Sequence, residues 1–206
     1  MPLTEPFDLY AAEYDRWFEE NQELYLAELA TVRSLLPPAG EGLEVGVGTG
    51  RFAAPLGIKT GVEPSPAMAE LAKKRGIKVY PGVAENLPFA AATFDFVLMV
   101  TVICFLDDVA AAFREAHRVL KKGGALIVAF LDRETAPGRE LEKKKERSKY
   151  YQKARFRSAA EVERYLTAAG LTPISSRQVI MEKNGRPVMV EGTGQGLFAV
   201  IAARKQ

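Results

Sequence analysis

Three glycines at alternate positions, Gly46, Gly48 and Gly50, follow a short apolar strand pattern. Because glycine has no Cβ atom, the backbone of such a turn can lie directly against a ligand. Glu63 ends the next strand pattern, where its carboxylate can accept two hydrogen bonds from a ribose diol. A dinucleotide fingerprint, G-x-G-x-x-G, would need glycine in place of Arg51. The E-x-G-x-G-x-G spacing therefore favours a nucleoside ligand that carries no phosphates.

Five motifs occur in the order typical of one known family. They occupy residues 43–52, 61–65, 84–89, 94–98 and 119–124. In these motifs the chain resembles the class I S-adenosylmethionine (SAM) dependent methyltransferases, of the kind that includes the ubiquinone and menaquinone biosynthesis enzymes. The resemblance is strong over residues 40–131 and looser toward both ends. It implies SAM as cofactor and S-adenosylhomocysteine (SAH) as product.

Alternating strand and helix patterns predict an α/β fold with a mainly parallel sheet. We expect strands over 42–47, 58–63, 77–81, 94–100 and 124–131, and helices over 50–56, 65–75, 108–121 and 158–169. Two β-like stretches, 174–181 and 197–203, suggest an antiparallel hairpin at the sheet edge. The resemblance implies a Rossmann-like sheet of seven strands, mostly parallel, with an antiparallel last strand.

The bulk properties fit one domain that covers residues 1–206. Within it we expect an N-terminal helical cap over 1–38 and a lid insertion over 133–157. The net charge of +2 gives no argument for nucleic acid, and one cysteine fits a reducing compartment. No apolar run has membrane-spanning length, so we expect no membrane insertion and a cytoplasmic location. We expect no metal site, and either a monomer or a homodimer.

The cofactor-binding residues follow from the resemblance. They are Glu44, Gly46, Gly48, Thr49, Gly50, Glu63, Pro64, Ser65, Ala84, Glu85, Met99 and Val100. Glu44 has two interpretations, a solvated charge or a carboxylate that orients the methionine amine through water. Val83 stands where relatives usually have aspartate, so the acceptor for the adenine amino group is open between the backbones of Ala84 and Glu85.

The acceptor side of the site is less defined by sequence. The expected substrate-pocket residues are Tyr10, Tyr14, Trp17, Thr101, Tyr150 and Tyr151. The N-terminal rings could equally form a stripe that docks a helix on the core. Many relatives have a histidine pair where this chain has Cys104 and Phe105, so we assign no general base and no catalytic residue.

Residues 139–157 combine basic and aromatic side chains, a composition that can bind nucleic acid. Glu140, Glu142 and Glu146 are interspersed at spacings that allow ion pairs along one helix. We therefore expect a solvated lid helix and no nucleic-acid partner.

The leading hypothesis is a methyltransferase that moves the methyl group of SAM to a small-molecule acceptor by in-line displacement. The missing acid–base pair suggests an alternative, a non-catalytic SAM-binding protein that regulates or scaffolds. A third possibility, a nicotinamide oxidoreductase, is disfavoured by Arg51.

Overall fold

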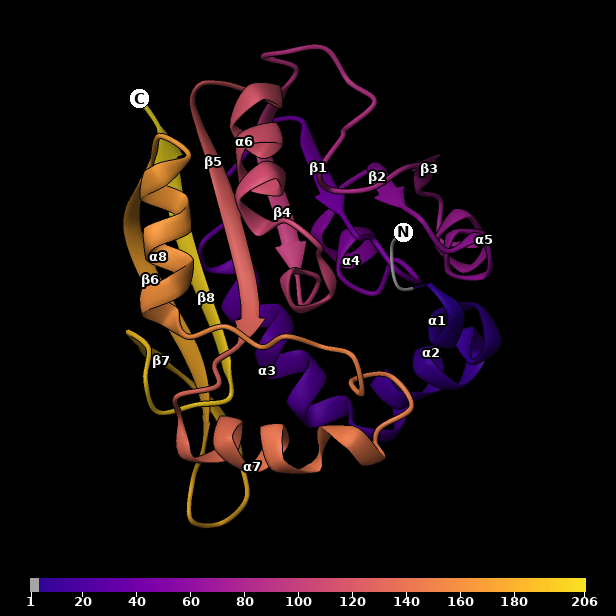
Figure 1. Ribbon diagram of the computed structural model, residues 1–206, viewed down its shortest axis with the longest axis vertical. Coiled ribbons are helices and arrows are strands. Elements are labelled where there is room, and N and C mark those ends of the chain that lie inside the picture. The colour runs from indigo at the N-terminus through magenta and orange to yellow at the C-terminus, as the bar shows by residue number, and fades with distance from the viewer. Residues whose placement is uncertain (1–3) are drawn as a thin grey trace.

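The computed structural model describes residues 4–206. One eight-stranded sheet runs through the molecule in the order β3-β2-β1-β4-β5-β8-β6-β7 (Figure 1). Its strands are β1 (Gly42–Val45), β2 (Thr60–Glu63), β3 (Lys78–Pro81), β4 (Phe94–Val100), β5 (Leu120–Leu131), β6 (Leu171–Met181), β7 (Pro187–Glu191) and β8 (Phe198–Lys205). Strands β1 to β5 pair in parallel, whereas β8 is antiparallel to both β5 and β6.

Helices cover both faces of this sheet. The helices are α1 (Glu5–Leu9), α2 (Ala11–Glu20), α3 (Gln22–Arg33), α4 (Ala53–Leu56), α5 (Pro66–Lys74), α6 (Val109–Val119), α7 (Ala136–Lys144) and α8 (Ala159–Ala168), with short 3₁₀ turns η1 (Ile103–Phe105) and η2 (Lys145–Arg147). Helices α6 and α8 lie on one face, and α3 and α4 lie on the other (Figure 1). Each face has its own apolar core, as expected for parallel strands buried on both sides.

Alternation along the strands explains the two cores. In β4, Val97 and Met99 face the core under α6 and α8, while Leu98 and Val100 face the core under α3 and α4. Successive side chains of a strand point to opposite faces, so every residue of such a strand can be apolar.

The helix boundaries have local causes. The Ser65 hydroxyl accepts a hydrogen bond from the Met68 backbone and caps α5, with Pro66 as first helical residue. Ser158 and Glu161 form a complete capping box at the start of α8, as their spacing suggests.

The expected α/β sheet with antiparallel C-terminal strands is confirmed. The sheet has eight strands instead of seven, because residues 187–191 add an edge strand that pairs with β6 across the turn at Asn184 and Gly185. Strand β8 inserts between β5 and β6, so the expected hairpin is part of the sheet and not its edge. Strand β5 also begins at Leu120, where it pairs with Phe94, earlier than the expected residue 124.

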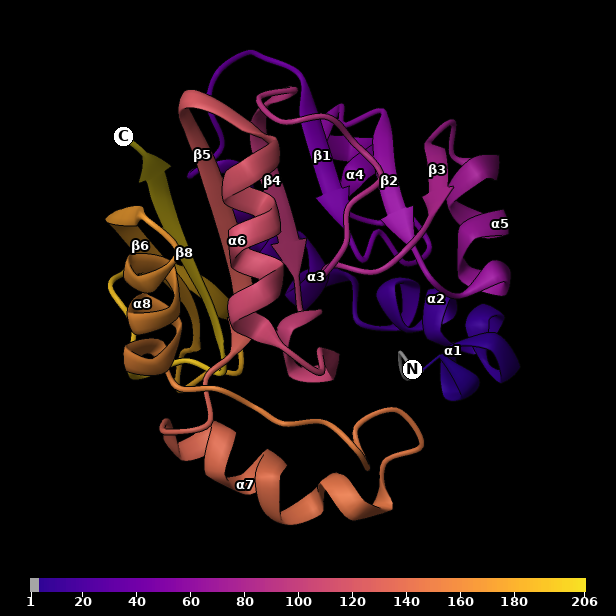
Figure 2. The same ribbon diagram turned by 45° about the horizontal axis from the view of Figure 1, so that its top comes forward.

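The N-terminal helices and the 133–157 segment both lie at the carboxyl ends of the parallel strands. Figure 2 shows α1 and α2 below β1 to β3, and α7 below β4 and β5. No helix within residues 4–206 is long and apolar enough to cross a membrane. Within the same residues, no group of three or more His, Cys, Asp or Glu side chains is arranged to hold a metal ion.

Candidate active site

A pocket of about 370 Å³ lies at the carboxyl ends of β1, β2, β3 and β4. This is the edge where open α/β sheets bind ligands, and the volume suits a small ligand. We call it the main pocket. Its lining residues are Thr4, Phe7, Val45, Gly46, Gly48, Val62, Glu63, Pro64, Met68, Gly82, Val83, Ala84, Glu85, Val100, Thr101, Val102, Phe105, Leu106 and Asp107.

The three glycines after β1 serve different purposes. A Cβ atom at Gly46 would come within 2.5 Å of Val102, and one at Gly50 would press on the α5 backbone at Ala72. A Cβ atom at Gly48 would meet no protein atom within 4 Å and would occupy the main pocket instead. Gly48 has a φ of +54°, which L side chains rarely adopt. Its bare backbone therefore leaves space on the side where a ligand would lie.

Glu63, at the end of β2, faces this bare backbone. Its Oε2 accepts a hydrogen bond from the Gly48 backbone NH and its Oε1 accepts one from the Ser65 NH, both at 2.9 Å. Burial raises the pKa of the carboxyl to about 7, although the two backbone hydrogen bonds oppose the rise. Each carboxylate oxygen has a second lone pair, so Glu63 can still accept two hydrogen bonds from a diol.

Glu44 lies inside the protein at 2% exposure, so its interpretation as a solvated charge is wrong. Burial raises the pKa of its carboxyl well above the usual value, with a hydrogen bond from the Ala53 backbone acting in the opposite direction. Its Oε2 is buried and has no hydrogen-bond partner within residues 4–206. A buried oxygen of this kind is costly unless a ligand or water satisfies it.

The loop after β3 forms another wall of the main pocket. Gly82, Val83, Ala84 and Glu85 all line it, and Val83 offers only an apolar side chain there. The Glu85 carboxylate accepts hydrogen bonds from the backbone NH groups of Asp107 and Asp108 at the start of α6. Glu85 thus ties two walls of the pocket together, and its backbone remains the candidate for polar contact with a ligand.

Thr101 follows the last residue of β4 and has a φ of +51°. A β-branched residue in this left-handed region is strained, and such strain is concentrated at functional sites. Thr101 lines the main pocket, and its side chain lies beside the Tyr14 hydroxyl of α2. Burial raises the pKa of Tyr14, and hydrogen bonding to Thr101 opposes that rise. Tyr14 therefore stays a neutral hydroxyl next to the strained turn.

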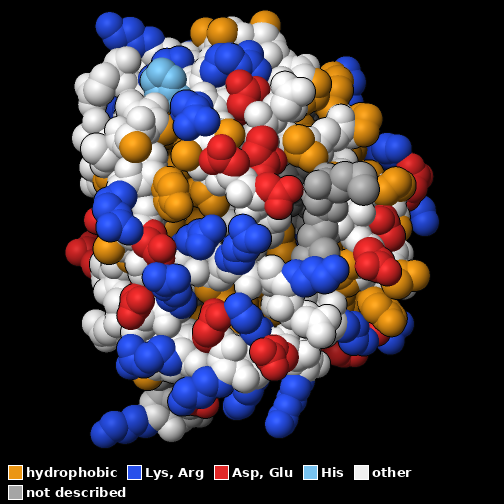
Figure 3. Space-filling model, viewed as in Figure 1, with side chains coloured by type: hydrophobic (Ala, Val, Ile, Leu, Met, Phe, Trp, Pro, Cys, Tyr) orange, Lys and Arg blue, Asp and Glu red, His pale blue; other side chains and the backbone are white. Residues whose placement is uncertain are grey.

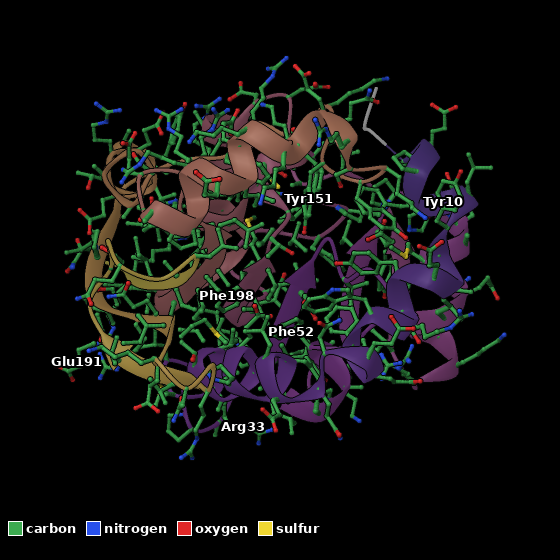
Figure 4. The ribbon with its side chains drawn as sticks, turned by 90° about the horizontal axis from the view of Figure 1, so that it is seen from below. Tyr10, Arg33, Phe52, Tyr151, Glu191 and Phe198 are labelled. Atoms are coloured by element: carbon green, nitrogen blue, oxygen red, sulfur yellow. The ribbon has the colours of Figure 1, made fainter. Side chains whose placement is uncertain are left out.

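Aromatic rings close the far end of the main pocket. The Phe7 ring of α1 packs edge-on against Tyr14 at 5.8 Å and against Phe105 at 5.1 Å, and stacks on Tyr150 at 5.8 Å. Phe105 in turn stacks on Tyr151 at 5.9 Å. Figure 4 shows Tyr151 beside the α7 segment. Rings from four chain segments thus exclude water from this end.

An ion-pair network attaches α2 to the glycine turn. Arg51 donates to both carboxylate oxygens of Asp15, at 2.9 and 2.8 Å, and to Glu19 at 2.7 Å. Arg75 donates to Asp15 at 2.8 Å and to the Thr49 carbonyl at 2.8 Å. Burial acts to raise the pKa of Asp15, but the hydrogen bonds from Arg51 and Arg75 outweigh it and lower this pKa to about 2. The helical cap and the turn are therefore held as one unit.

Part of the sequence-predicted set lines the main pocket. The members that do so are Gly46, Gly48, Glu63, Pro64, Ala84, Glu85, Val100 and Thr101. The cofactor candidates outside its lining are Glu44, Thr49, Gly50, Ser65 and Met99. Gly50 packs against α5, and Ser65 caps that helix. Their roles toward a ligand stay predictions.

Of the expected substrate-pocket residues, Thr101 lines the main pocket and others lie elsewhere. Tyr10 and Tyr150 line a second, smaller pocket of about 190 Å³ with Lys149. Trp17 is 39% exposed, and its ring packs edge-on against Phe18. Sequence reasoning missed Phe7 and Asp107 as pocket residues. Phe7 lies in a short helix with no motif of its own, and Asp107 follows η1, where the sequence also carries no motif.

The remaining candidates behave as unreactive or solvated groups. Burial raises the pKa of the Cys104 thiol to about 12, so it is a poor nucleophile. In the 133–157 segment, Lys143 pairs with Glu140 and Lys145 with Glu142. Figure 3 shows basic and acidic side chains mixed over this region of the surface. This agrees with the expected solvated helix.

Comparison with known proteins agrees with this geometry. A family model described as a methyltransferase domain matches residues 43–128. An uncharacterized protein of Methanocaldococcus jannaschii is 45% identical over 97% of this chain and 98% of its own length. A demethylmenaquinone methyltransferase of Chlorobaculum parvum is 38% identical over 93 residues, which are 42% of this chain and 39% of that protein.

A crystal structure from Thermotoga maritima is similar over 99% of this chain and 100% of that one, with a TM-score of 0.94 and 48% identity. That protein is described as a SAM-dependent methyltransferase and possible histamine N-methyltransferase. None of these matches favours a nicotinamide enzyme or a non-catalytic SAM-binding protein. The chain therefore belongs to the class I SAM-dependent methyltransferases, which are enzymes that use SAM as methyl donor.

Proposed function

We propose that this enzyme methylates a small-molecule acceptor that reaches the methyl donor beside Thr101. The observation that carries the proposal is the position of Glu63, whose two oxygens bridge Gly48 and Ser65 at the carboxyl edge of the sheet. A ribose diol bound there places the rest of a nucleoside along the 82–85 loop and its sulfonium side toward Thr101. SAM supplies an activated methyl group, which transfers by direct displacement.

The residues of the chain contribute binding, alignment and exclusion of water. Gly48 offers bare backbone, and the unpartnered Oε2 of buried Glu44 supports a polar ligand group close to the turn. At the other end, Tyr14 and Thr101 are polar groups set among the rings that close the pocket. Holding the two reactants in one dry geometry can supply much of the rate increase.

The way the pocket is closed supports the proposal of a small acceptor. Phe7 contacts rings from α2, η1 and the segment after α7. Lys149 of that segment pairs with Glu13 of α2 at 2.6 Å and lies 4.6 Å over the Tyr10 ring. We propose that residues 133–157 act as a lid and that residues up to 38 act as the cap. A macromolecular acceptor would have to displace both.

The basic residues of the lid support the same view. Lys143, Lys145 and Lys149 each pair with a carboxylate, which leaves less charge for a phosphate backbone. The one cysteine, Cys104, is free and buried, which supports the proposal of a reducing, cytoplasmic setting. The expectation of a monomer or a homodimer stays a prediction.

Calorimetry with SAH tests the cofactor site. Glu63→Gln should weaken SAH binding by about 30-fold or more, because an amide cannot accept both ribose hydrogen bonds as a charged carboxylate does. Glu70→Gln is the matched control, since Glu70 lies exposed on the neighbouring helix α5 and pairs with Lys73 of the same helix. Equal SAH affinity in the two variants would contradict the assigned role of Glu63.

Labelled SAM tests the acceptor class. We expect methyl transfer to at least one member of a panel of small amines, thiols and phenols. Transfer to protein or RNA with none to the panel would contradict the proposal of a small-molecule acceptor.

A further inference from the structure

Asp8 of α1 binds the first turn of helix α5. Its Oδ1 accepts a hydrogen bond from the Ser65 hydroxyl at 2.5 Å and lies 3.5 Å from the backbone nitrogen of Ala67. The Ser65 hydroxyl also accepts a hydrogen bond from the Met68 NH at 3.2 Å, as the N-cap of α5. A hydroxyl has one proton to donate, and that of Ser65 is directed to the Asp8 carboxylate. The carboxylate also lies at the positive end of the α5 dipole.

Ser65 is shared between Asp8 and the acid of the cofactor site. The Ser65 backbone NH donates to Oε1 of Glu63 at 2.9 Å, while its hydroxyl donates to Asp8. Ser65 has 1% exposure and Glu63 has 8%, so water has little access to this junction. A chain of three residues, Asp8, Ser65 and Glu63, therefore connects α1 to the carboxylate that we propose binds the ribose.

Helix α1 depends on such contacts for its position. It has five residues, none of which is buried, and a single turn is not stable by itself. The helix packs next to α5 (Figure 1) and supplies Phe7 to the lining of the main pocket, where Thr4 also lies. Because Phe7 and Asp8 are adjacent in sequence, the bond from Asp8 to Ser65 fixes the place from which Phe7 reaches the pocket.

We propose that Asp8 is a positioning residue, which holds α1 over the cofactor end of the main pocket through Ser65, so that docking of α1 and binding of the cofactor strengthen each other. This inference rests on the proposed function, which assigns the ribose diol to Glu63. Asp8 does not itself line the main pocket, so its effect on the cofactor passes through Ser65 and α1. Coupling between two equilibria is reciprocal, and bound cofactor must therefore stabilise the docked helix.

Hydrogen exchange measures the docking of α1 directly. The backbone NH groups of Asp8 and Tyr10 form hydrogen bonds within this segment, so their exchange reports its opening. In the wild type, SAH should slow exchange over residues 5–10 by about fivefold or more. Asp8→Ala should lose most of this slowing. Alanine is the best helix former, so the loss would not come from weaker helix propensity.

Glu5→Ala is the matched control, because Glu5 and Asp8 are the two acids in the first turn of α1. Glu5 is exposed and lines the second pocket, not the main one. This variant should keep the slowing by SAH. Asp8→Asn keeps an acceptor oxygen without the charge, so its loss should fall between those of the wild type and Asp8→Ala. Exchange in β4 should be equal in all four proteins, as a check that the sheet is intact.

Calorimetry measures the same coupling from the side of the ligand. Asp8→Ala should bind SAH about fivefold or more weakly than the wild type, and Glu5→Ala should stay within about twofold. A bond that serves only to cap α5 would change stability but would leave both SAH affinity and the slowing by SAH unaltered.

The outcomes separate this inference from the proposed function. Wild-type SAH affinity in Asp8→Ala would overturn the inference, as would an SAH effect on residues 5–10 that is absent from the wild type or survives in Asp8→Ala. Failure of SAH to bind the wild type would instead overturn the proposed function, and the inference would fall with it.

Discussion

Two buried carboxylates, Glu63 and Glu28, differ in how the structure surrounds them, and the two ends of the main pocket differ in how they are built. Both oxygens of Glu63 are held by backbone NH groups only 15 and 2 residues away. Glu28 lies in α3 at 9% exposure, and no side-chain hydrogen bond or ion pair to it is formed within residues 4–206. The Glu63 end of the main pocket, where we propose the cofactor binds, is thus local and preorganised, whereas its aromatic end is assembled from α1, α2, η1 and the segment after α7.

This difference suits a fixed donor and a variable acceptor. A nucleoside pocket made from strand ends and turns depends on few residues and can be kept while the proposed cap and the proposed lid change. The aromatic end depends on side chains that several segments bring together, so a few substitutions there can alter specificity without disturbing the sheet.

The largest effect should come from filling the open side of the glycine turn. Gly48→Val introduces a side chain into the main pocket at a φ of +54°, so SAH binding should weaken at least about 100-fold by calorimetry. Gly57→Val is the control, because Gly57 also has positive φ and open space but lies outside the pocket. If both variants bind SAH equally, the Glu63 end of the main pocket is not where the cofactor binds.

Replacing Glu28 by glutamine should stabilise the protein at alkaline pH. Burial raises the pKa of Glu28 in the folded state to about 8, above its usual value of 4.5, so folding favours the protonated form. The contribution is fully present below pH 4.5 and is lost as pH rises through about 8. At pH 9 we expect Glu28→Gln to be more stable by about 2 kcal/mol in urea unfolding, with little difference at pH 5. A loss of stability at pH 9 would show that a partner compensates the charge.

The pH dependence of SAH binding should report Glu63. Because burial raises its pKa to about 7, part of the unliganded enzyme carries a neutral carboxyl at neutral pH. A diol donates two hydrogen bonds to the charged form, so SAH affinity should increase about tenfold from pH 6 to pH 8. The Glu63→Gln variant should show a flat profile over this range. A wild-type affinity that falls with pH would contradict the assignment.

The smallest effect should come from breaking the ion pairs that attach α2 to the glycine turn. Asp15→Asn removes the charge that Arg51 and Arg75 share, and we expect a loss of about 1 kcal/mol and a Tm lower by a few degrees. The pKa of Asp15 is depressed to about 2, so its contribution is present above pH 3.8 and is lost as pH falls through 2. The difference between wild type and variant should therefore shrink in acid. The opposite trend would rule out the ion pair as its source.

The same division explains what could be predicted from sequence. Gly48 and Glu63 were found because their positions follow from one turn and one strand end, which are local patterns. The parallel sheet followed from strand–helix alternation, whereas β7 was missed because a five-residue edge strand that begins with Pro187 leaves only a faint signal.

Glu28 was overlooked because a glutamate in an amphipathic helix normally faces solvent. A signal was nevertheless present, since Leu24, Glu28, Thr31 and Leu35 recur at spacings of four, three and four on one face. A single acid within such an apolar stripe is uncommon. The stacking of Phe7 on Tyr150 joins positions more than 100 residues apart, and it depends on tertiary structure alone.

The Phe7 ring touches three separate segments at once, and this has a consequence for turnover. Because one ring joins these segments, none of them can swing open without disrupting contacts to the other two. We therefore expect release of product to require displacement of α1 and to depend on this aromatic packing. Loosening that ring should quicken departure while admitting solvent to the sulfonium, so speed and fidelity oppose each other at a single side chain.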